Sequence, residues 1–298
     1  MSLHAKLVGA AATLVAATAV CAAPTRPGLD PAPTIDATGM TYVALGDSAA
    51  AAPLVPYQAD PPGCLKSTND YPSVLARGIG ARSFSDVACS GATTADITYR
   101  AQQTRRGSVA PQIDAIGDET ELITITIGGN DIELAGSASK CRRSSLTLPA
   151  CFDEFTTAGQ DRFSAAIRRQ IPVWEDMVDA IRARAPRARI VFVGYGRYVR
   201  SGGCFGRQPI NPRDADYFQA KVDELDEAQR ALAARKRVEF FDTRPLSVGH
   251  DMCAPAEQRY FEGFVLSHEA APLHPNAMGA TAVANALAQH LATTRTNT

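Results

Sequence analysis

Short apolar segments recur along the chain, and four of them end at a glycine or an aspartate. They are continuously apolar rather than alternating, which is typical of strands that are buried on both faces of a sheet. A fifth segment, at 83–87, is more polar and is a weaker example of the same kind. The expected strands are therefore 41–45, 83–87, 122–127, 189–193 and 237–241.

Segments with apolar residues at helical spacing separate these strands. The clearest helices are expected at 163–184, 214–235 and 277–292, with Pro172 bending or interrupting the first of them. This alternation predicts an α/β fold, a flavodoxin-like three-layer sandwich. Its central, mostly parallel sheet of about five strands would be covered by helices on both faces. Ligands bind beyond the carboxyl ends of the strands in such sheets.

The first residues have the pattern of an export signal. Lys6 precedes an uncharged apolar run from Leu7 to Val20, and small side chains follow up to Ala22. We expect a signal peptide over residues 1–22, which makes the mature protein secreted or held in the cell envelope. An uncleaved membrane anchor is the alternative, but the run is short and rich in alanine for a span, so we expect no stable membrane insertion.

The remaining chain divides into a lead-in and one domain. Residues 23–39 contain four prolines and no apolar periodicity, which predicts a flexible segment. Residues 40–298 are expected to form a single domain, since their length suits one sizeable core. The net charge of the whole chain is −1, so nothing attracts it to nucleic acid. We expect a monomer without a nucleic-acid partner.

Six of the seven cysteines lie beyond the signal peptide, and an even number in an exported chain favours disulfides. Six cysteines allow fifteen connectivities. Sequential pairing closes the shortest loops and predicts Cys64–Cys89, Cys141–Cys151 and Cys204–Cys253. Zinc binding is the alternative, but no pair has the close spacing that is usual for zinc ligands, so we expect no metal.

Three glycine-containing segments follow predicted strands and could carry chemistry. Gly46-Asp47-Ser48 would expose a serine hydroxyl at a strand-to-helix turn, although a serine or aspartate there can simply cap a helix. Gly128-Gly129-Asn130-Asp131 could aim an amide at an oxyanion, although asparagine also favours turns. Gly91 could offer an unobstructed backbone N–H, or could be a plain loop glycine.

His274 is the favoured general base among the histidines. Pro275 follows it directly and restricts the backbone at the junction with the last helix. His250 and His268, which lie in loops, are the alternatives, while His290 falls within the last helix.

These four features, in this order, resemble the four sequence blocks of the SGNH hydrolases, formerly called GDSL esterases and lipases. The resemblance extends from Tyr42 to Ala280 and is greatest to secreted actinobacterial lipases and esterases, which carry three disulfides. It implies that Ser48 attacks an ester carbonyl while His274 takes its proton and returns it to the leaving alkoxide. It also implies an oxyanion hole made of the Ser48 and Gly91 N–H groups and the Asn130 side chain, with no cofactor.

The chain departs from the family at the residue that orients the histidine. Many members have an aspartate three residues before the histidine, where this chain has Ala271. An alanine side chain cannot accept the imidazole N–H, so we expect a Ser–His dyad whose ring is held by the carbonyl of Ala271 or a neighbour. Glu269 is the nearest carboxylate in the sequence and is the alternative third member.

The sequence and the family resemblance indicate the substrate class only in part. A small-molecule or lipid carboxylic ester is expected, and the 53–62 loop, with Leu54, Val55 and Tyr57, either lines an acyl site or is merely packed. The alternatives are a polysaccharide O-acetyl esterase and a non-catalytic lipid- or carbohydrate-binding protein of the same fold.

Overall fold

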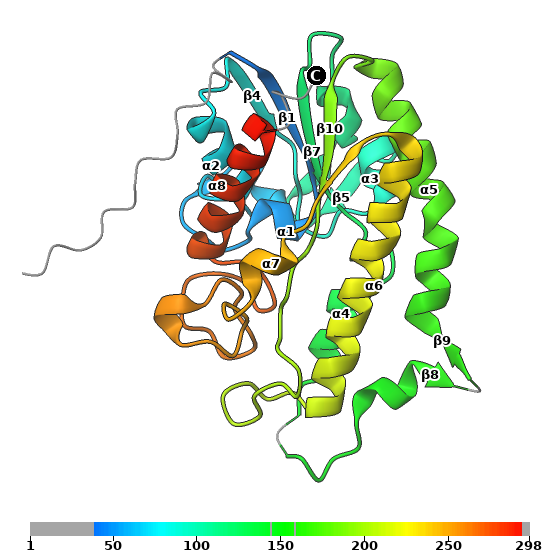
Figure 1. Ribbon diagram of the computed structural model, residues 1–298, viewed down its shortest axis with the longest axis vertical. Helices are drawn as coiled ribbons and strands as arrows, with labels where there is room; N and C mark the ends of the chain where they lie inside the picture. Colours follow the sequence, from blue (N-terminus) through cyan, green and yellow to red (C-terminus); the bar gives the residue numbers. More distant parts are fainter. Residues whose placement is uncertain (1–38, 144, 158, 294–298) are drawn as a thin grey trace, which may run out of the picture. The chain divides into compact units, whose positions relative to one another are not determined.

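The computed structural model describes residues 39–143, 145–157 and 159–293. The expected signal peptide and the expected flexible lead-in up to residue 38 lie outside these residues. At the centre is a five-stranded sheet in which every neighbouring pair is parallel (Figure 1). Its strands are β1 (Thr41–Gly46), β4 (Ser83–Asp86), β7 (Leu122–Thr126), β10 (Arg189–Val193) and β11 (Glu239–Phe241).

The strand order places a ligand-binding crevice at one point of the sheet. The order is β11-β10-β7-β1-β4, which is the flavodoxin-like order 2-1-3-4-5 when the five strands are counted along the chain. The predicted fold class is therefore confirmed. The order reverses between β1 and β7, and open sheets of this kind bind ligands beyond the carboxyl ends of the strands at that position.

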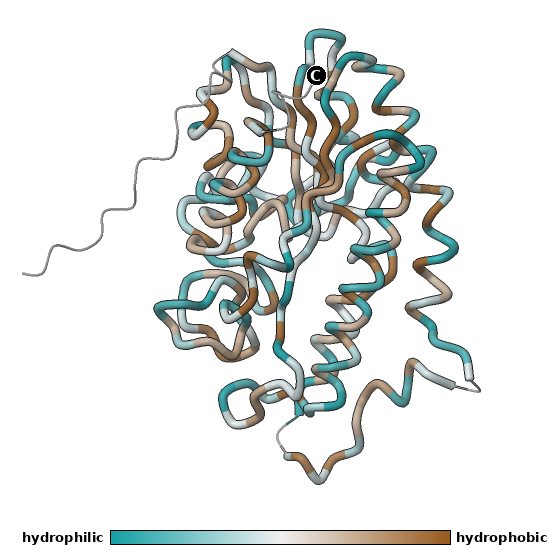
Figure 2. The backbone as a smooth tube through the Cα atoms, in the orientation of Figure 1, coloured by the Kyte–Doolittle hydropathy of each residue, from teal (hydrophilic) through white to brown (hydrophobic). Residues whose placement is uncertain are grey.

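Each face of the sheet buries its own apolar cluster. Successive side chains of a strand point to opposite faces, so Tyr42 and Ala44 join one cluster and Val43 and Leu45 the other. Helices α2 (Tyr71–Gly78) and α8 (Ala277–Thr293) cover the first face, and α5 (Arg162–Arg184) and α6 (Pro212–Lys236) the second. Figures 1 and 2 show apolar strands between these helical layers.

The boundaries agree with the expected ones to within two residues, and two departures have a clear physical reason. Helix α5 runs unbroken through Pro172, because Trp174, Met177 and other buried residues on either side of the proline pack against the same cluster. Strand β11 begins at Glu239 instead of Arg237, since α6 continues to Lys236. Arg237 then ends the helix in the left-handed conformation, with φ of 53°.

Shorter elements connect this framework. They are α1 (Ser48–Ala51), β2 (Gln58–Ala59), η1 (Pro62–Cys64), β3 (Lys66–Ser67), α3 (Thr94–Thr98), β5 (Gln102–Thr104), β6 (Gly107–Val109), η2 (Gln112–Ala115), α4 (Leu134–Lys140), η3 (Cys151–Glu154), β8 (Thr156–Thr157), β9 (Gln160–Asp161), α7 (Arg244–Ser247) and η4 (Ala256–Gln258). None of the helices in the described part of the chain has both the length and the apolar character that a membrane crossing requires.

Three disulfides connect the loops, in the pairing expected from the sequence. Cys64–Cys89 joins η1 to the segment after β4, Cys141–Cys151 closes the connection after α4, and Cys204–Cys253 joins the loops before α6 and after α7. Two of the three therefore tie together loops that follow strands of the central sheet.

Candidate active site

Ser48 lies at the carboxyl end of β1 as the first residue of α1. The turn before it is tight: a Cβ on Gly46 would lie 2.7 Å from the carbonyl oxygen of Thr126 on the neighbouring strand, so only glycine fits there. Asp47 caps α1, accepting a 2.8 Å hydrogen bond from the N–H of Ala49 through Oδ1. At the first position of a helix the N–H of Ser48 has no intrahelical acceptor, which leaves it free for a ligand.

His274 faces Ser48 across the crevice at the carboxyl ends of β1 and β7. Its Nε2 lies 2.7 Å from Oγ of Ser48, although 226 residues separate the two in the sequence. Burial lowers the pKa of His274 below its ordinary value, because the charged imidazolium loses hydration. The ring is therefore neutral at neutral pH, with a lone pair available to a hydroxyl proton.

The other nitrogen of His274 contacts a backbone carbonyl of the loop, and the residue that provides it is the neighbour of Ala271. Nδ1 lies 2.8 Å from the carbonyl oxygen of Pro272, not from that of Ala271. The physical reason is the loop conformation: Ala271 donates its N–H to Pro53, and Leu273 takes a φ of 61°, which turns the Pro272 carbonyl toward the ring. Glu269 is exposed and has no contact with His274, so it is not the partner of the ring in this structure.

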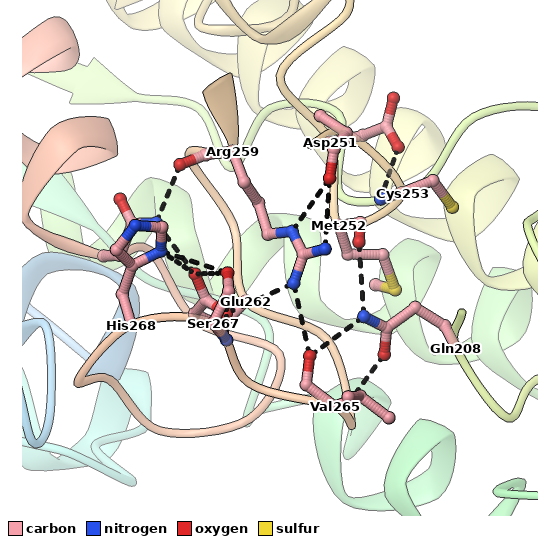
Figure 3. A network of polar contacts seen from close by, with 11 residues as sticks. Gln208, Asp251, Met252, Cys253, Arg259, Glu262, Val265, Ser267 and His268 are labelled. Carbon is pink, nitrogen blue, oxygen red and sulfur yellow. Dashed lines mark hydrogen bonds and ion pairs between the residues drawn. The ribbon is translucent and has the colours of Figure 1, made fainter. Parts of the chain in front are cut away.

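Glu262, which no motif or spacing pointed to, supports the His274 loop. Its backbone pairs with the His274 loop. The N–H of Glu262 donates to the carbonyl of His274 at 2.9 Å, and the carbonyl of Glu262 accepts from the N–H of Leu273 at 3.0 Å. Its buried carboxylate accepts hydrogen bonds from Asn276 and the Ser267 N–H, and contacts His268 and Arg259 (Figure 3). All these contacts of Glu262 are to residues of nearby loops, and loop contacts leave no regular spacing in the sequence that could identify the residue.

The two alternative bases, His250 and His268, contact other residues instead of Ser48. Nδ1 of His250 lies 2.5 Å from the carbonyl oxygen of Gln258, and its ring stacks on Tyr260. Nδ1 of His268 lies 2.8 Å from Glu262. Neither ring contacts Ser48.

Asn130 shares one pocket with Ser48 and His274. It follows β7, the strand beside β1, so the parallel register brings the two turns together. One N–H of its side-chain amide donates to the carbonyl of Ala92 at 2.9 Å. The second N–H has no protein acceptor in the described residues and is free to bind a ligand.

Gly91 is held near the same turn but does not line this pocket. Its φ of 84° lies in the region that favours glycine, and its neighbours are fixed, since Ser90 and Ala92 donate their N–H groups to the carbonyls of Cys64 and Cys89. Cys89 in turn donates to Gly46, the residue that begins the Ser48 turn. The N–H of Gly91 finds no acceptor within residues 39–143, 145–157 and 159–293.

The two aspartates beside these turns order the loops. Asp131 accepts hydrogen bonds from the N–H and the hydroxyl of Thr94 at 2.9 and 2.7 Å. Oδ2 of Asp47 accepts a 2.5 Å hydrogen bond from the Tyr195 hydroxyl, and burial raises the pKa of Asp47 to about 7. Neither carboxylate contacts His274. No group of three or more potential ligands in the described residues is placed to hold a metal ion.

An apolar pocket opens beside Ser48 and His274. It lies between α4, α6 and the loops after β10 and α7. Its lining includes Tyr195 and Tyr198 and the apolar residues Ala49, Leu134, Ala135, Ala138, Val199, Ile210, Phe218, Val222, Leu225, Met252 and Leu273. The 53–62 loop contributes nothing to it: Leu54 and Tyr57 are exposed, and Val55 packs with Ala270. Such a pocket suits a hydrocarbon chain rather than a sugar.

A hydroxyl hydrogen-bonded to a neutral histidine, free N–H donors next to it and an apolar pocket are typical of serine hydrolases that act on esters. The chain belongs to the GDSL-like lipase/acylhydrolase family, whose model matches residues 44–282, and is a carboxylic ester hydrolase of the lipase and esterase type.

Streptomyces proteins are among its relatives. Lipase 2 of Streptomyces coelicolor is 36% identical over 257 residues, which is 83% of this chain and 82% of the relative. The extracellular lipase of Streptomyces rimosus superposes with a TM-score of 0.70 at 28% identity, covering 86% of this chain and 99% of that one. A phospholipase A1 of Streptomyces albidoflavus, at 22% identity and a TM-score of 0.68 over 86% of this chain and 99% of its own, shares the fold.

Proposed function

We propose that the protein hydrolyses esters through a Ser48–His274 dyad. The observation that carries the proposal is the 2.7 Å contact between Nε2 of His274 and Oγ of Ser48. His274 takes the hydroxyl proton as Oγ bonds to the ester carbonyl carbon, and then gives that proton to the departing alkoxide. A water molecule, deprotonated by the same histidine, attacks the acyl-enzyme, and Ser48 regains its proton as the acid leaves.

Three N–H donors stabilise the negative charge that develops on the carbonyl oxygen of the substrate. These are the backbone groups of Ser48 and Gly91 and the free N–H of the Asn130 side chain. Donors fixed before the reaction stabilise such a charge without reorganising, and losing one typically costs about 10²–10³ in rate. Asn130→Ala should therefore lower kcat by about that factor.

The acyl chain of the substrate occupies the apolar pocket beside Ser48. Its lining favours fatty acyl esters over the acetylated polysaccharides that were the other enzymatic candidate, since a cleft for sugars would present polar side chains. The name of the Streptomyces coelicolor relative, Lipase 2, supports the same substrate class. A non-catalytic binding role has no such support, whereas a serine hydroxyl within hydrogen-bond reach of a histidine is what nucleophilic catalysis requires.

The mature enzyme is exported after removal of residues 1–22 as a signal peptide. The three disulfides support this proposal, since such bonds persist in oxidising compartments outside the cytosol. The Streptomyces rimosus lipase is likewise described as extracellular.

The test uses purified protein, chromogenic esters of short and long fatty acids and a fluorophosphonate probe. Wild type should hydrolyse the esters and be labelled by the probe, whereas Ser48→Ala should do neither. Ser108→Ala, on the exposed hairpin of β5 and β6, is the matched control and should behave as wild type. Equal turnover by Ser48→Ala and wild type would refute the proposal.

A further inference from the structure

The side chain of Tyr195 connects the turn that carries Ser48 with the turn that carries Asn130. It follows Gly194 at the carboxyl end of β10. Its hydroxyl accepts a 2.8 Å hydrogen bond from the N–H of Gly129 and donates a 2.5 Å hydrogen bond to Oδ2 of Asp47. Gly129 directly precedes Asn130, and Asp47 directly precedes Ser48.

The arrangement requires specific residues on each side. A Cβ on Gly129 would lie 3.3 Å from the Tyr195 hydroxyl oxygen, so a larger residue would crowd the contact. The backbone of Tyr195 is itself anchored, because its N–H donates to Oδ1 of the buried Asp226 on α6 at 3.1 Å. Tyr195 is therefore fixed at both ends, its hydroxyl by the turns after β1 and β7 and its backbone by α6.

We propose that Tyr195 is a positioning residue of the reaction. Its hydroxyl holds the turn that carries Ser48 at a fixed separation from the turn that carries Asn130. The nucleophile and one oxyanion donor must keep their relative positions to within a fraction of an ångström, because a displacement of about 1 Å can cost 10²-fold in rate. This inference rests on the proposed Ser48–His274 mechanism.

The direction of the hydrogen bonds supports the same role. Burial and the neighbouring Asp47 carboxylate raise the pKa of Tyr195 well above its ordinary value, so the phenol keeps its proton. It then acts as donor to Asp47 and acceptor from Gly129 whenever the Asp47 carboxyl is ionised, which is the case above a pH of about 7. A phenylalanine keeps the ring against the apolar pocket and removes only this connection.

The test compares Tyr195→Phe with Tyr42→Phe. Tyr42 is fully buried on β1 and its hydroxyl also makes one short hydrogen bond, 2.7 Å to Thr124, away from the site. Tyr195→Phe should lower kcat by about 10- to 100-fold while KM stays within about twofold, since only transition-state stabilisation is lost. The rate of fluorophosphonate labelling should fall by the same factor. Tyr42→Phe should keep the wild-type kcat.

A double-mutant cycle separates positioning from general destabilisation. In Asp47→Asn the side-chain oxygen keeps its hydrogen bond with Ala49 while the amide group faces Tyr195, so this change breaks the same hydrogen bond from the hydroxyl. The double variant should then be no slower than the slower single variant. Three results would each overturn the inference. They are a Tyr195→Phe variant with the kcat of wild type, a double variant whose loss in kcat is the product of the losses in the two single variants, and an equal loss in Tyr42→Phe. An inactive wild type would instead refute the proposed function, and this role with it.

Discussion

Nδ1 of His274 lies 2.8 Å from the carbonyl oxygen of Pro272, so the ring that faces Ser48 is oriented by a neutral acceptor. A carbonyl can only accept, which places the ring proton on Nδ1 and leaves the lone pair of Nε2 for the serine. It adds no negative charge to stabilise the imidazolium. The pKa of His274 is therefore governed by burial, which lowers it.

The first prediction concerns the acidic limb of the pH–rate profile. A histidine acts as a base only in its neutral form, and a lowered pKa keeps His274 neutral to a more acidic pH. The acidic midpoint of kcat/KM should thus lie below about 6.5, the value of an unperturbed histidine. Rates measured across pH for a soluble short-chain ester check this, and a midpoint above that value would contradict it.

Restoring a carboxylate should move that midpoint in the opposite direction. Ala271→Asp places an acidic group three residues before His274, where its negative charge favours the imidazolium and raises the pKa of the ring. The acidic limb of Ala271→Asp should shift to higher pH than that of wild type. Ala271→Asn, which has the same shape without the charge, is the control and should keep the wild-type midpoint.

Glu262 should be important for stability. Its carboxylate is fully buried and lies 3.5 Å from the buried guanidinium of Arg259, so Glu262→Ala would leave that cation without a counter-charge. Removing one partner of a buried pair typically costs about 3–5 kcal/mol of unfolding free energy. Chemical denaturation measures this loss. Glu269→Ala, which removes an exposed carboxylate from the same loop, should leave the denaturation midpoint unchanged, and equal losses in the two variants would argue against the buried pair.

The Cys204–Cys253 disulfide should contribute more stability than Cys141–Cys151. Its cysteines are 49 residues apart, against 10 for the other pair, and a longer loop loses more entropy when it is closed in the unfolded chain. Replacing both cysteines by alanine should cost about 4 kcal/mol for the first pair and about 3 kcal/mol for the second. Denaturant unfolding of the two double variants tests the order, and the reverse order would contradict the loop-entropy argument.

The framework could be predicted because it depends on local patterns. Continuous apolar strands that end in glycine predicted the parallel sheet, and the sheet brings Ser48 and Asn130 together because β1 and β7 are neighbours. His274 was singled out by Pro275 and by its place before the last helix. Each of these signals lies within a few residues of the position it identifies.

The connections between the loops could not be predicted in the same way. The acceptor for His274 depends on the φ angle of Leu273, which no pattern in the sequence specifies. The Tyr195–Asp47 hydrogen bond joins residues 148 apart, and a tyrosine after a strand usually just packs. The sequence left open whether the 53–62 loop lines an acyl site or is merely packed. The apolar pocket forms between α4 and α6, whose relative position is a tertiary property.

The apolar pocket predicts how the enzyme ranks acyl chains. Ala135, on α4, lines the pocket and is only partly buried, so Ala135→Phe can direct its ring into the pocket and fill part of it. Excluding two or three methylene groups, each worth about 0.8 kcal/mol when buried, should lower kcat/KM for long-chain esters by about 10- to 60-fold. Short-chain esters, which do not reach the ring, should be hydrolysed as before.

The control adds the same side chain elsewhere on the helix. Lys140→Phe lies at an exposed position of α4 outside the pocket and should keep the wild-type ratio of long-chain to short-chain activity. If Ala135→Phe lowers kcat/KM equally for both esters, the substitution has disturbed Ser48 and His274 rather than the acyl site. If it lowers neither, the acyl chain does not enter this pocket, because a ring in its path must displace methylene groups that would otherwise be buried.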